Sequence, residues 1–340
     1  MRVLLIGGSG FIGPHVAAEL AKQGHELAIF HRGRVAIPHH RSIHGERSRL
    51  AASRDAIAAF APDVVVDLIT SSERHATDLI ATMRGITRRL VVLSSMDVYR
   101  ACGVLHGFEP GPLEPLPLTE KSPLRTKLQT YPPKQIAMLQ QVFGWLDAEY
   151  DKIPAERALL ADGELAVTIL RLPMVYGPGD ALRRLHPLVK RIDDGRNAII
   201  VPVAPWRASK GYVEDVAFAI ALAAQDTGRT KSVVYNVGER DALSELEWAE
   251  FVAQVAGWRG ELVTLPEELM PPHLRVPGNA LQDWVADTSR IRRELGFAER
   301  VSRDEALRRT IAWERSAPVG FVPHRFDYPA EDLAIARRNA

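Results

Sequence analysis

The chain has 340 residues, of which 46% are hydrophobic and 25% charged, and its formal net charge is +1. This composition predicts a globular protein with one large or two modest cores, and the near-neutral charge argues against a dedicated nucleic-acid binder. The single cysteine, Cys102, excludes an internal disulfide and fits a reducing compartment. The apolar runs are too short for a signal peptide or a membrane span, so the sequence predicts a cytoplasmic protein with no membrane partner.

The N-terminal segment joins an apolar strand to a glycine-rich turn. Val3–Ile6 runs into glycines at 7, 10 and 13, and a helical stretch extends from the turn to about residue 22. The first glycine allows a sharp turn, the second lets backbone N–H groups approach a phosphate, and the third lets the helix pack close to the sheet. The turn predicts a dinucleotide-phosphate site made of Gly7, Ser9, Gly10, Phe11, Ile12 and Gly13.

Strands alternate with helical stretches through the first half of the chain. The predicted strands are 2–6, 26–31, 42–44, 63–69, 89–95 and 165–171. Several are nearly continuous runs of Val, Ile and Leu, which is typical of parallel strands covered on both faces. The predicted fold class is therefore α/β, a doubly wound parallel sheet (Rossmann-like) with a smaller C-terminal α/β substrate lobe.

The glycine turn and five later segments resemble one enzyme family. The turn has the spacing Gly-x-x-Gly-x-x-Gly, and the later segments are Val91–Tyr99, Leu170–Pro178, Tyr212–Ala217, Tyr235–Gly238 and Asp287–Phe297. Together they resemble the extended short-chain dehydrogenase/reductase superfamily, in its NAD-dependent epimerase/dehydratase (nucleotide-sugar epimerase-like) branch. The resemblance covers nearly the whole chain.

The resemblance also implies a division of the chain. Residues 1–178 are expected to form the dinucleotide-binding domain, to which 212–237 return. An insertion at 101–149 departs from the family, and its prolines argue against regular structure until Lys134 begins a helical pattern. The remaining expected parts are the substrate-binding lobe, 179–316, and a C-terminal tail, 317–340.

The end of the second strand bears on the cofactor. Relatives that use NAD place an acidic residue there for the ribose 2′-hydroxyl, whereas this chain has His31 followed by Arg32 and Arg34. These arginines can pair with a 2′-phosphate, so the sequence favours NADP over NAD; the alternative is that they are solvated loop residues. The resemblance also implies cofactor contacts from Glu46, Leu68, Lys152 and Pro173.

The family's chemistry uses a hydroxyl that positions the substrate, a tyrosine that exchanges a proton, and a lysine that lowers the tyrosine pKa. Ser95, at the end of the fifth strand, matches the hydroxyl, with Ser94 as its rival. The family's tyrosine lies four residues before the lysine, but the residue four before Lys152 is Ala148. Since Lys152 is in the right downstream register, the tyrosine is the displaced member.

Two tyrosines compete for this role. Two extended residues span roughly 7 Å and four helical residues about 6 Å, so an extended Asp151 capping a helix that starts near Lys152 would bring Tyr150 close to the usual position. Tyr131 is the alternative, with 132–149 inserted between tyrosine and lysine. A third reading is that neither acts and the site only binds.

The predicted function is an NAD(P)-dependent epimerase/reductase-type enzyme that transfers a hydride reversibly at a hydroxyl or keto carbon. The expected substrate is small and sugar-like, nucleotide sugars included. A dehydratase mechanism is weakened because Met96 stands where dehydratases of this branch carry a second acid beside the one matched by Asp97. Separately, Ala208 stands where nucleotide-sugar enzymes of the family carry a diphosphate-binding arginine, which argues against that contact here. The alternative is a non-catalytic dinucleotide-binding sensor or an RNA-associated scaffold. No metal site is predicted, and a homodimer is left open.

Overall fold

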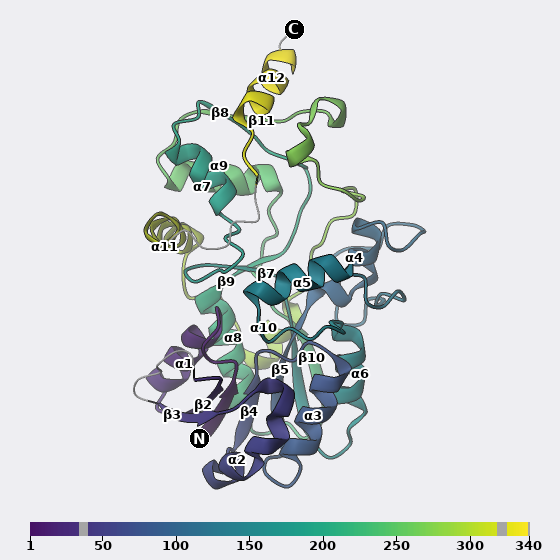
Figure 1. Ribbon diagram of the computed structural model, residues 1–340, viewed down its shortest axis with the longest axis vertical. Helices are drawn as coiled ribbons and strands as arrows, with labels where there is room; N and C mark the ends of the chain where they lie inside the picture. The colour runs from purple at the N-terminus through teal and green to yellow at the C-terminus, as the bar shows by residue number, and fades with distance from the viewer. Residues whose placement is uncertain (34–39, 318–324, 339–340) are drawn as a thin grey trace.

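The computed structural model describes residues 1–33, 40–317 and 325–338, and it has two lobes stacked along the long axis of the molecule (Figure 1). The N-terminal lobe contains the large sheet. The other lobe carries the smaller sheets and ends in the C-terminal helix. The described helices include none that is long and apolar enough to cross a membrane.

The large sheet has seven strands, all parallel, in the order β10-β6-β5-β4-β1-β2-β3. Its strands are β1 (Arg2–Ile6), β2 (Glu26–His31), β3 (Arg41–His44), β4 (Val64–Asp67), β5 (Arg89–Ser95), β6 (Ala166–Leu172) and β10 (Val233–Asn236). The predicted doubly wound sheet is confirmed. The fourth strand ends at Asp67, two residues earlier than predicted. The seventh strand comes from the segment expected to return to this lobe.

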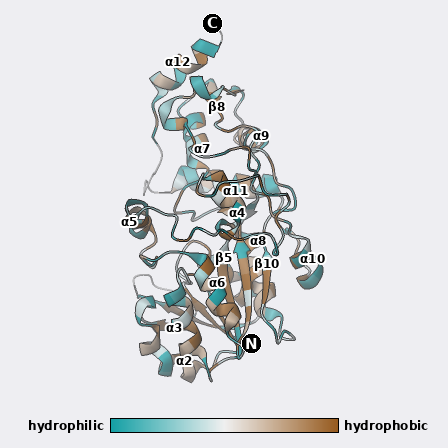
Figure 2. Ribbon diagram, turned by 90° about the vertical axis from the view of Figure 1, so that its right-hand side faces the viewer, coloured by the Kyte–Doolittle hydropathy of each residue, from teal (hydrophilic) through white to brown (hydrophobic). Residues whose placement is uncertain are grey.

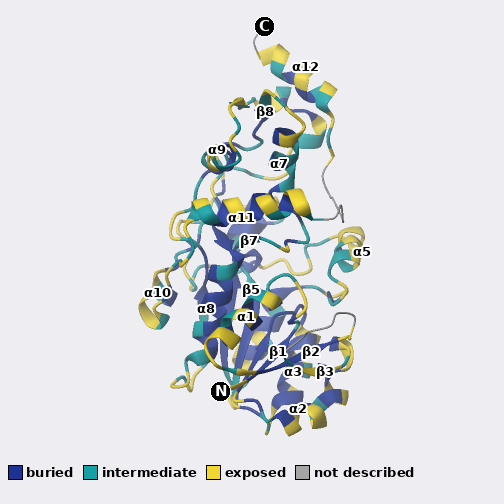
Figure 3. Cartoon of the chain, turned by 90° about the vertical axis from the view of Figure 1, so that its left-hand side faces the viewer, coloured by how far each residue is buried: buried dark blue, intermediate teal, exposed yellow. Residues whose placement is uncertain are grey.

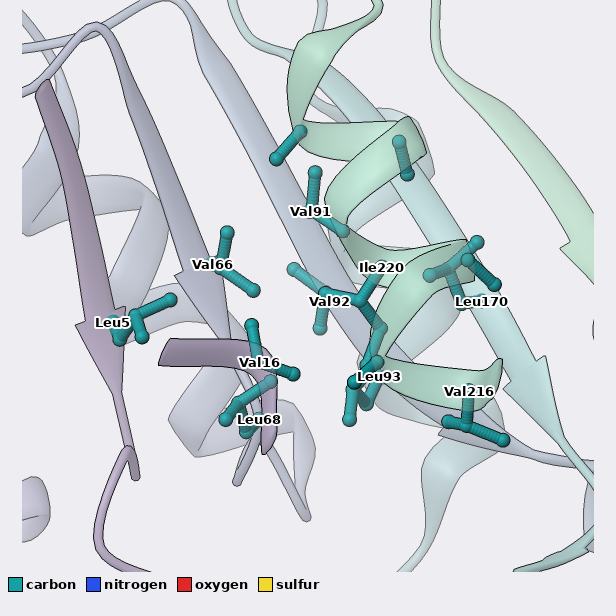
Figure 4. Close-up of a cluster of buried hydrophobic side chains, with 14 of the residues drawn as sticks. Leu5, Val16, Val66, Leu68, Val91, Val92, Leu93, Leu170, Val216 and Ile220 are labelled. Carbon is teal, nitrogen blue, oxygen red and sulfur yellow. The ribbon is translucent and has the colours of Figure 1, made fainter. Parts of the chain in front are cut away.

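Helices cover both faces of this sheet because its strands are apolar on both sides, as the brown strands of Figure 2 and the dark blue strands of Figure 3 show. On one face α1 (Gly13–Lys22) packs beside α8 (Val213–Gln225). Figure 4 shows Ile220 of α8 beside Val92 and Leu93 of β5, and Val16 of α1 beside Leu68, which follows β4. Further helices of this lobe include α2 (Arg54–Phe60), α3 (Glu73–Met83) and α6 (Lys152–Ala161), with α3 packed against α6.

The insertion is more regular than its prolines suggest. It contains α4 (Arg100–Leu105) as well as α5 (Pro133–Val142), and both lie between the lobes (Figure 1). The prediction of no regular structure before Lys134 is therefore wrong at the start of the segment. The physical reason is that the first proline of the insertion is Pro110, so nothing prevents a buried helical turn and a half directly after Tyr99.

In the described part of the chain, the second lobe contains two small parallel sheets and four helices. The sheets pair β7 (Met174–Tyr176) with β9 (Lys210–Tyr212), and β8 (Ala198–Ile200) with β11 (Glu261–Val263). Helix α10 (Ser289–Leu295) packs against β10 of the large sheet, and the helices of the second lobe are α7 (His186–Asp193), α9 (Glu245–Val255), α11 (Arg303–Ser316) and α12 (Tyr328–Arg338). The last of these belongs to the expected tail, but it packs on this lobe through Ala334 and through a 2.6 Å ion pair of Glu331 with Arg191 of α7.

Candidate active site

A cavity of about 1200 Å³ lies at the carboxyl edge of the large sheet. Its wall is built by the glycine turn after β1, the segments after β2 and β4, the loop after β6, and the insertion. The sequence-predicted cofactor residues that line it are Gly7, Ser9, Gly10, Phe11, Ile12, Gly13, Arg32, Glu46, Leu68 and Pro173. Lys152 is not among the lining residues, and Arg34 lies outside the residues that the structure describes.

The glycine turn has the form that a bound phosphate needs. Gly7 has a φ of +89°, and a Cβ there would lie 2.5 Å from the Ile69 side chain. A Cβ on Gly13 would overlap the Gly8 backbone, which fixes the close approach of α1. At Gly10 the nearest protein atom to a Cβ would be the Gly7 carbonyl oxygen, 3.7 Å away. The space over Gly10 is thus open to a ligand, and these residues fit a dinucleotide.

The end of β2 carries no carboxylate. His31 is buried and its Nδ1 accepts a hydrogen bond from Gly33 N (3.1 Å), so its other ring nitrogen carries the proton. Burial and the neighbouring His44 lower the pKa of His31, which keeps the ring neutral. The exposed Arg32 guanidinium donates to the Gly144 carbonyl oxygen (3.2 Å) in the insertion. An acid, Glu46, does line the cavity, in the loop after β3.

The two serines that end β5 face different surroundings. Ser94 is buried and donates to Glu156 of α6 (2.5 Å), within the ion pair that this glutamate forms with Arg171. Ser95 lines the cavity, and its Oγ accepts a hydrogen bond from Asp97 N (3.2 Å) in the short 3₁₀ turn that follows. Of the two candidates, Ser95 is therefore the one within reach of a ligand.

The chain around the displaced tyrosine has the predicted local form. Helix α6 begins at Lys152, and Asp151 is an extended N-cap (φ −161°, ψ 129°) whose carboxylate accepts from Ile153 N (2.9 Å). The Tyr150 hydroxyl donates to Asp97 Oδ2 (2.9 Å), and its ring meets that of Tyr131 edge-on at 5.3 Å. Both tyrosines therefore share one region beside the end of β5.

The tyrosine and lysine are not paired as the family pattern implies. The buried Lys152 ammonium donates to two main-chain carbonyl oxygens, those of Thr70 and Leu93, the latter at 3.1 Å. Burial lowers the pKa of Lys152, whereas burial and the charge of Asp97 raise the pKa of Tyr150 above its ordinary value. The expectation of a tyrosine pKa lowered by the lysine is not met, because the hydroxyl faces a carboxylate instead.

Asp97 is the residue whose part in the site the sequence left undetermined. Its carboxyl is buried, Oδ2 accepts from Tyr150, and Oδ1 has no hydrogen-bond partner among the described residues. Burial raises its pKa, and the positive charges of Arg125 and Lys152 oppose that rise. Arg125 also donates to the Asp97 carbonyl oxygen (2.5 Å), but it lies in the proline-rich stretch, where no motif marks it.

A doubly wound sheet with an open glycine turn, a hydroxyl and a tyrosine–carboxyl pair at its carboxyl edge defines an enzyme of the dinucleotide-dependent, short-chain dehydrogenase type. The chain belongs to the NAD dependent epimerase/dehydratase family, whose model matches residues 3–238. The predicted family, fold class and oxidoreductase or isomerase activity are thereby confirmed. The family also confirms the nicotinamide dinucleotide cofactor at the level of NAD dependence.

Individual relatives span most of the chain. A UDP-glucose 4-epimerase of Lactobacillus helveticus is 25% identical, covering 94% of this chain and 99% of its own. A 2′-dehydrokanamycin reductase of Streptomyces kanamyceticus is 26% identical, covering 89% and 79%. Among solved structures, UDP-glucose-4-epimerase from Stenotrophomonas maltophila with bound NAD and formylated UDP-arabinopyranose has a TM-score of 0.67 at 20% identity, covering 93% and 98%. This last likeness supports the fold.

Proposed function

We propose that the protein is an NAD(P)-dependent epimerase or reductase that transfers a hydride reversibly at a hydroxyl or keto carbon of a sugar-like substrate. The observation that carries the proposal is the open space above Gly10, at the edge of a cavity large enough for a dinucleotide. The relatives support it, since one is named a UDP-glucose 4-epimerase and another a 2′-dehydrokanamycin reductase.

Each residue of the site has one task in this proposal. The cofactor supplies the hydride chemistry when bound. Backbone N–H groups of the glycine turn hold the pyrophosphate, and Ser95 donates to the substrate oxygen and orients it. Tyr150 exchanges the proton of that oxygen. Lys152 fixes the ends of β4 and β5 through its two carbonyl contacts and so positions Ser95 and Tyr150.

The substrate class is narrowed by the second lobe. The position at which nucleotide-sugar enzymes of this family carry an arginine for the diphosphate is the buried Ala208. The neighbouring Arg207 pairs with Glu247 (3.3 Å) and donates to the Ala242 carbonyl oxygen (3.0 Å). Both observations favour a sugar-like substrate without a nucleotide diphosphate over a nucleotide sugar.

For the cofactor we propose a preference for NADP(H). Arg32 is exposed, lines the cavity and follows β2 where an NAD-specific site would carry an acid. Arg32→Ala should weaken NADPH binding more than NADH binding and so narrow the gap between their dissociation constants. Fluorescence titration of both nucleotides measures this gap. A wild-type protein that binds NADH as tightly as NADPH would overturn the preference.

The whole proposal is tested at Gly10. The Cβ of a valine there would lie 3.7 Å from its nearest protein atom, so Gly10→Val should keep the fold while its side chain extends into the pyrophosphate position. We expect nucleotide binding to be lost and the circular dichroism spectrum to be unchanged. Turnover of keto or hydroxyl sugars, followed at 340 nm, should disappear with it. Equal nucleotide affinity in wild type and variant would refute the proposed site.

A further inference from the structure

One wall of the cavity comes from the insertion. The segment between α5 and α6 contributes lining residues from Phe143 to Ala148, and the aromatic side chains among them are Phe143 and Trp145. Their rings lie 5.7 Å apart, and both are only half-buried. The segment is therefore a surface of the cavity with two aromatic faces available to a ligand.

The segment is fixed at one end by Asp147. Its carboxylate accepts from the hydroxyl of Ser72 and the guanidinium of Arg74, each at 2.7 Å. Its backbone N–H donates to the hydroxyl of Ser71 (3.0 Å). These hydrogen bonds hold the pKa of Asp147 below its ordinary value in spite of burial. All three partners belong to the loop after β4 and the start of α3, so this anchor lies on the β4 side of the sheet.

The second anchor lies on the β2 side. Arg32, the residue after β2, donates to the Gly144 carbonyl oxygen (3.2 Å). The Arg32 guanidinium passes so close that a Cβ on Gly144 would lie 3.1 Å from its nearest nitrogen. In the sheet β1 lies between β4 and β2. The segment from Gly144 to Asp147 therefore crosses the carboxyl end of β1, where the glycine turn begins.

We propose that Phe143 and Trp145 bind the adenosine half of the dinucleotide, and that the Arg32 and Asp147 anchors hold these two side chains over it. This proposal rests on the proposed function, because it takes a dinucleotide to occupy the glycine turn. The adenosine half is assigned because the adenosine ribose of a doubly wound fold lies at the end of β2, where Arg32 holds Gly144. An adenine ring has an aromatic face that stacks on such side chains.

The consequence is slow release of the nucleotide. A dinucleotide covered by this segment can leave only when the Asp147 or Arg32 anchor opens. Trp145→Ala should speed dissociation of NADPH and NADH alike, on the order of 10-fold each, because one aromatic contact with a base contributes about that factor. Trp145→Phe should restore slow release. Arg32→Ala differs from the Trp145 variants, because it should speed the dissociation of NADPH more than that of NADH.

Dissociation rates are measured by stopped-flow displacement of bound NADPH, followed by its fluorescence. Asp147→Asn should also speed release, whereas its control, Glu149→Gln, alters an exposed side chain two residues away and should not. Hydrogen exchange of the wild-type protein needs no variant: NADPH should slow exchange of the amides at 143–147 and leave those at 107–111 unchanged.

The outcomes separate this proposal from the proposed function. If wild type binds NADPH and Gly10→Val does not, the dinucleotide site stands. Release from Trp145→Ala at the wild-type rate, or an unchanged exchange rate at 143–147, would then overturn the role of the segment alone. If wild type binds neither NADPH nor NADH, both proposals fall.

Discussion

At the scale of single residues, the 2.9 Å contact of the Tyr150 hydroxyl with Asp97 determines which proton step the pair can perform. Burial and the Asp97 carboxylate, which accepts a hydrogen bond from the phenol, raise the pKa of Tyr150, so the tyrosine stays protonated. In the proposed reaction it would donate this proton to the alkoxide that forms when a keto carbon is reduced. Removal of a proton from a hydroxyl substrate would instead pass through Tyr150 to Asp97.

The hydroxyl of Tyr150 is expected to be essential for turnover. Tyr150→Phe should lower kcat by roughly 10²- to 10⁴-fold, the usual contribution of a general acid or base, while NADPH affinity stays nearly unchanged. Tyr131→Phe is the matched control, because the two rings are in contact and only Tyr150 bonds to Asp97. Steady-state kinetics and nucleotide titration of both variants measure this. A larger loss in Tyr131→Phe would transfer the role to that tyrosine.

Asp97 gives the reaction a pH dependence with a defined sign. Burial raises the pKa of Asp97, so its protonated form persists to higher pH than in water. When substrate oxidation requires the carboxylate as proton acceptor, the rate should fall as the pH drops through this raised pKa. Asp97→Asn should lower kcat and remove that acidic limb, while NADPH affinity is retained. Rate profiles over pH for both proteins measure it, and identical profiles would contradict it.

At the scale of elements, local signals were predictable and distant contacts were not. Short runs of consecutive residues determine the glycine turn, the parallel strands and the Asp151 cap, so the sequence predicted all three. Asp147 could not be recognised, since its partners Ser72 and Arg74 are more than 70 positions away and no motif links them. Helix α4 was also not predicted. The prolines of the insertion begin at Pro110, so the composition of the whole segment does not describe the residues of α4, which precede them.

The start of α6 depends on Asp151. Its carboxylate caps Ile153 N (2.9 Å) and also accepts from Gln129 N (2.7 Å), so it fixes both the helix and the approach of Tyr150. Asp151→Ala should destabilise the protein by more than about 2 kcal/mol, the upper range for a lost cap, because it also removes the ion-pair partner of the buried Arg125 (3.5 Å), and it should lower kcat as Tyr150 shifts. Asp151→Asn retains an acceptor and should lose less than half as much. Urea denaturation measures the stability; a fully stable and active Asp151→Ala would refute this role.

At the scale of the whole molecule, the two lobes contribute different parts of the cavity wall. The glycine turn, the end of β2 and the insertion line the part of the cavity where we propose the nucleotide site, whereas the second lobe adds residues such as Arg184 and Trp313 at one side of the cavity. The second lobe is held together in part by buried ion pairs, which include Arg183 with Glu314 and Arg191 with Glu331. Damage to this lobe should therefore lower stability before it lowers nucleotide affinity.

Helix α12 offers a direct test of this division. Burial would raise the pKa of Glu331, but hydrogen bonds from Arg191 and His273 hold it below its ordinary value. The stabilisation from this carboxylate is therefore present at neutral pH and lost as acid protonates it. Glu331→Ala leaves the buried Arg191 charge without this partner and should cost about 3–5 kcal/mol at pH 7.

The neighbouring Asp332 is the matched control for Glu331, because it pairs with Arg196 at the surface and Asp332→Ala should cost at most about 1 kcal/mol. Thermal unfolding should accordingly show a large drop in Tm for Glu331→Ala and a small one for Asp332→Ala. Below the unfolding temperature, titration with NADPH should give both variants the wild-type affinity, because α12 contributes no residue to the lining of the cavity. A parallel loss of nucleotide affinity in Glu331→Ala would show that the second lobe shapes the nucleotide site directly.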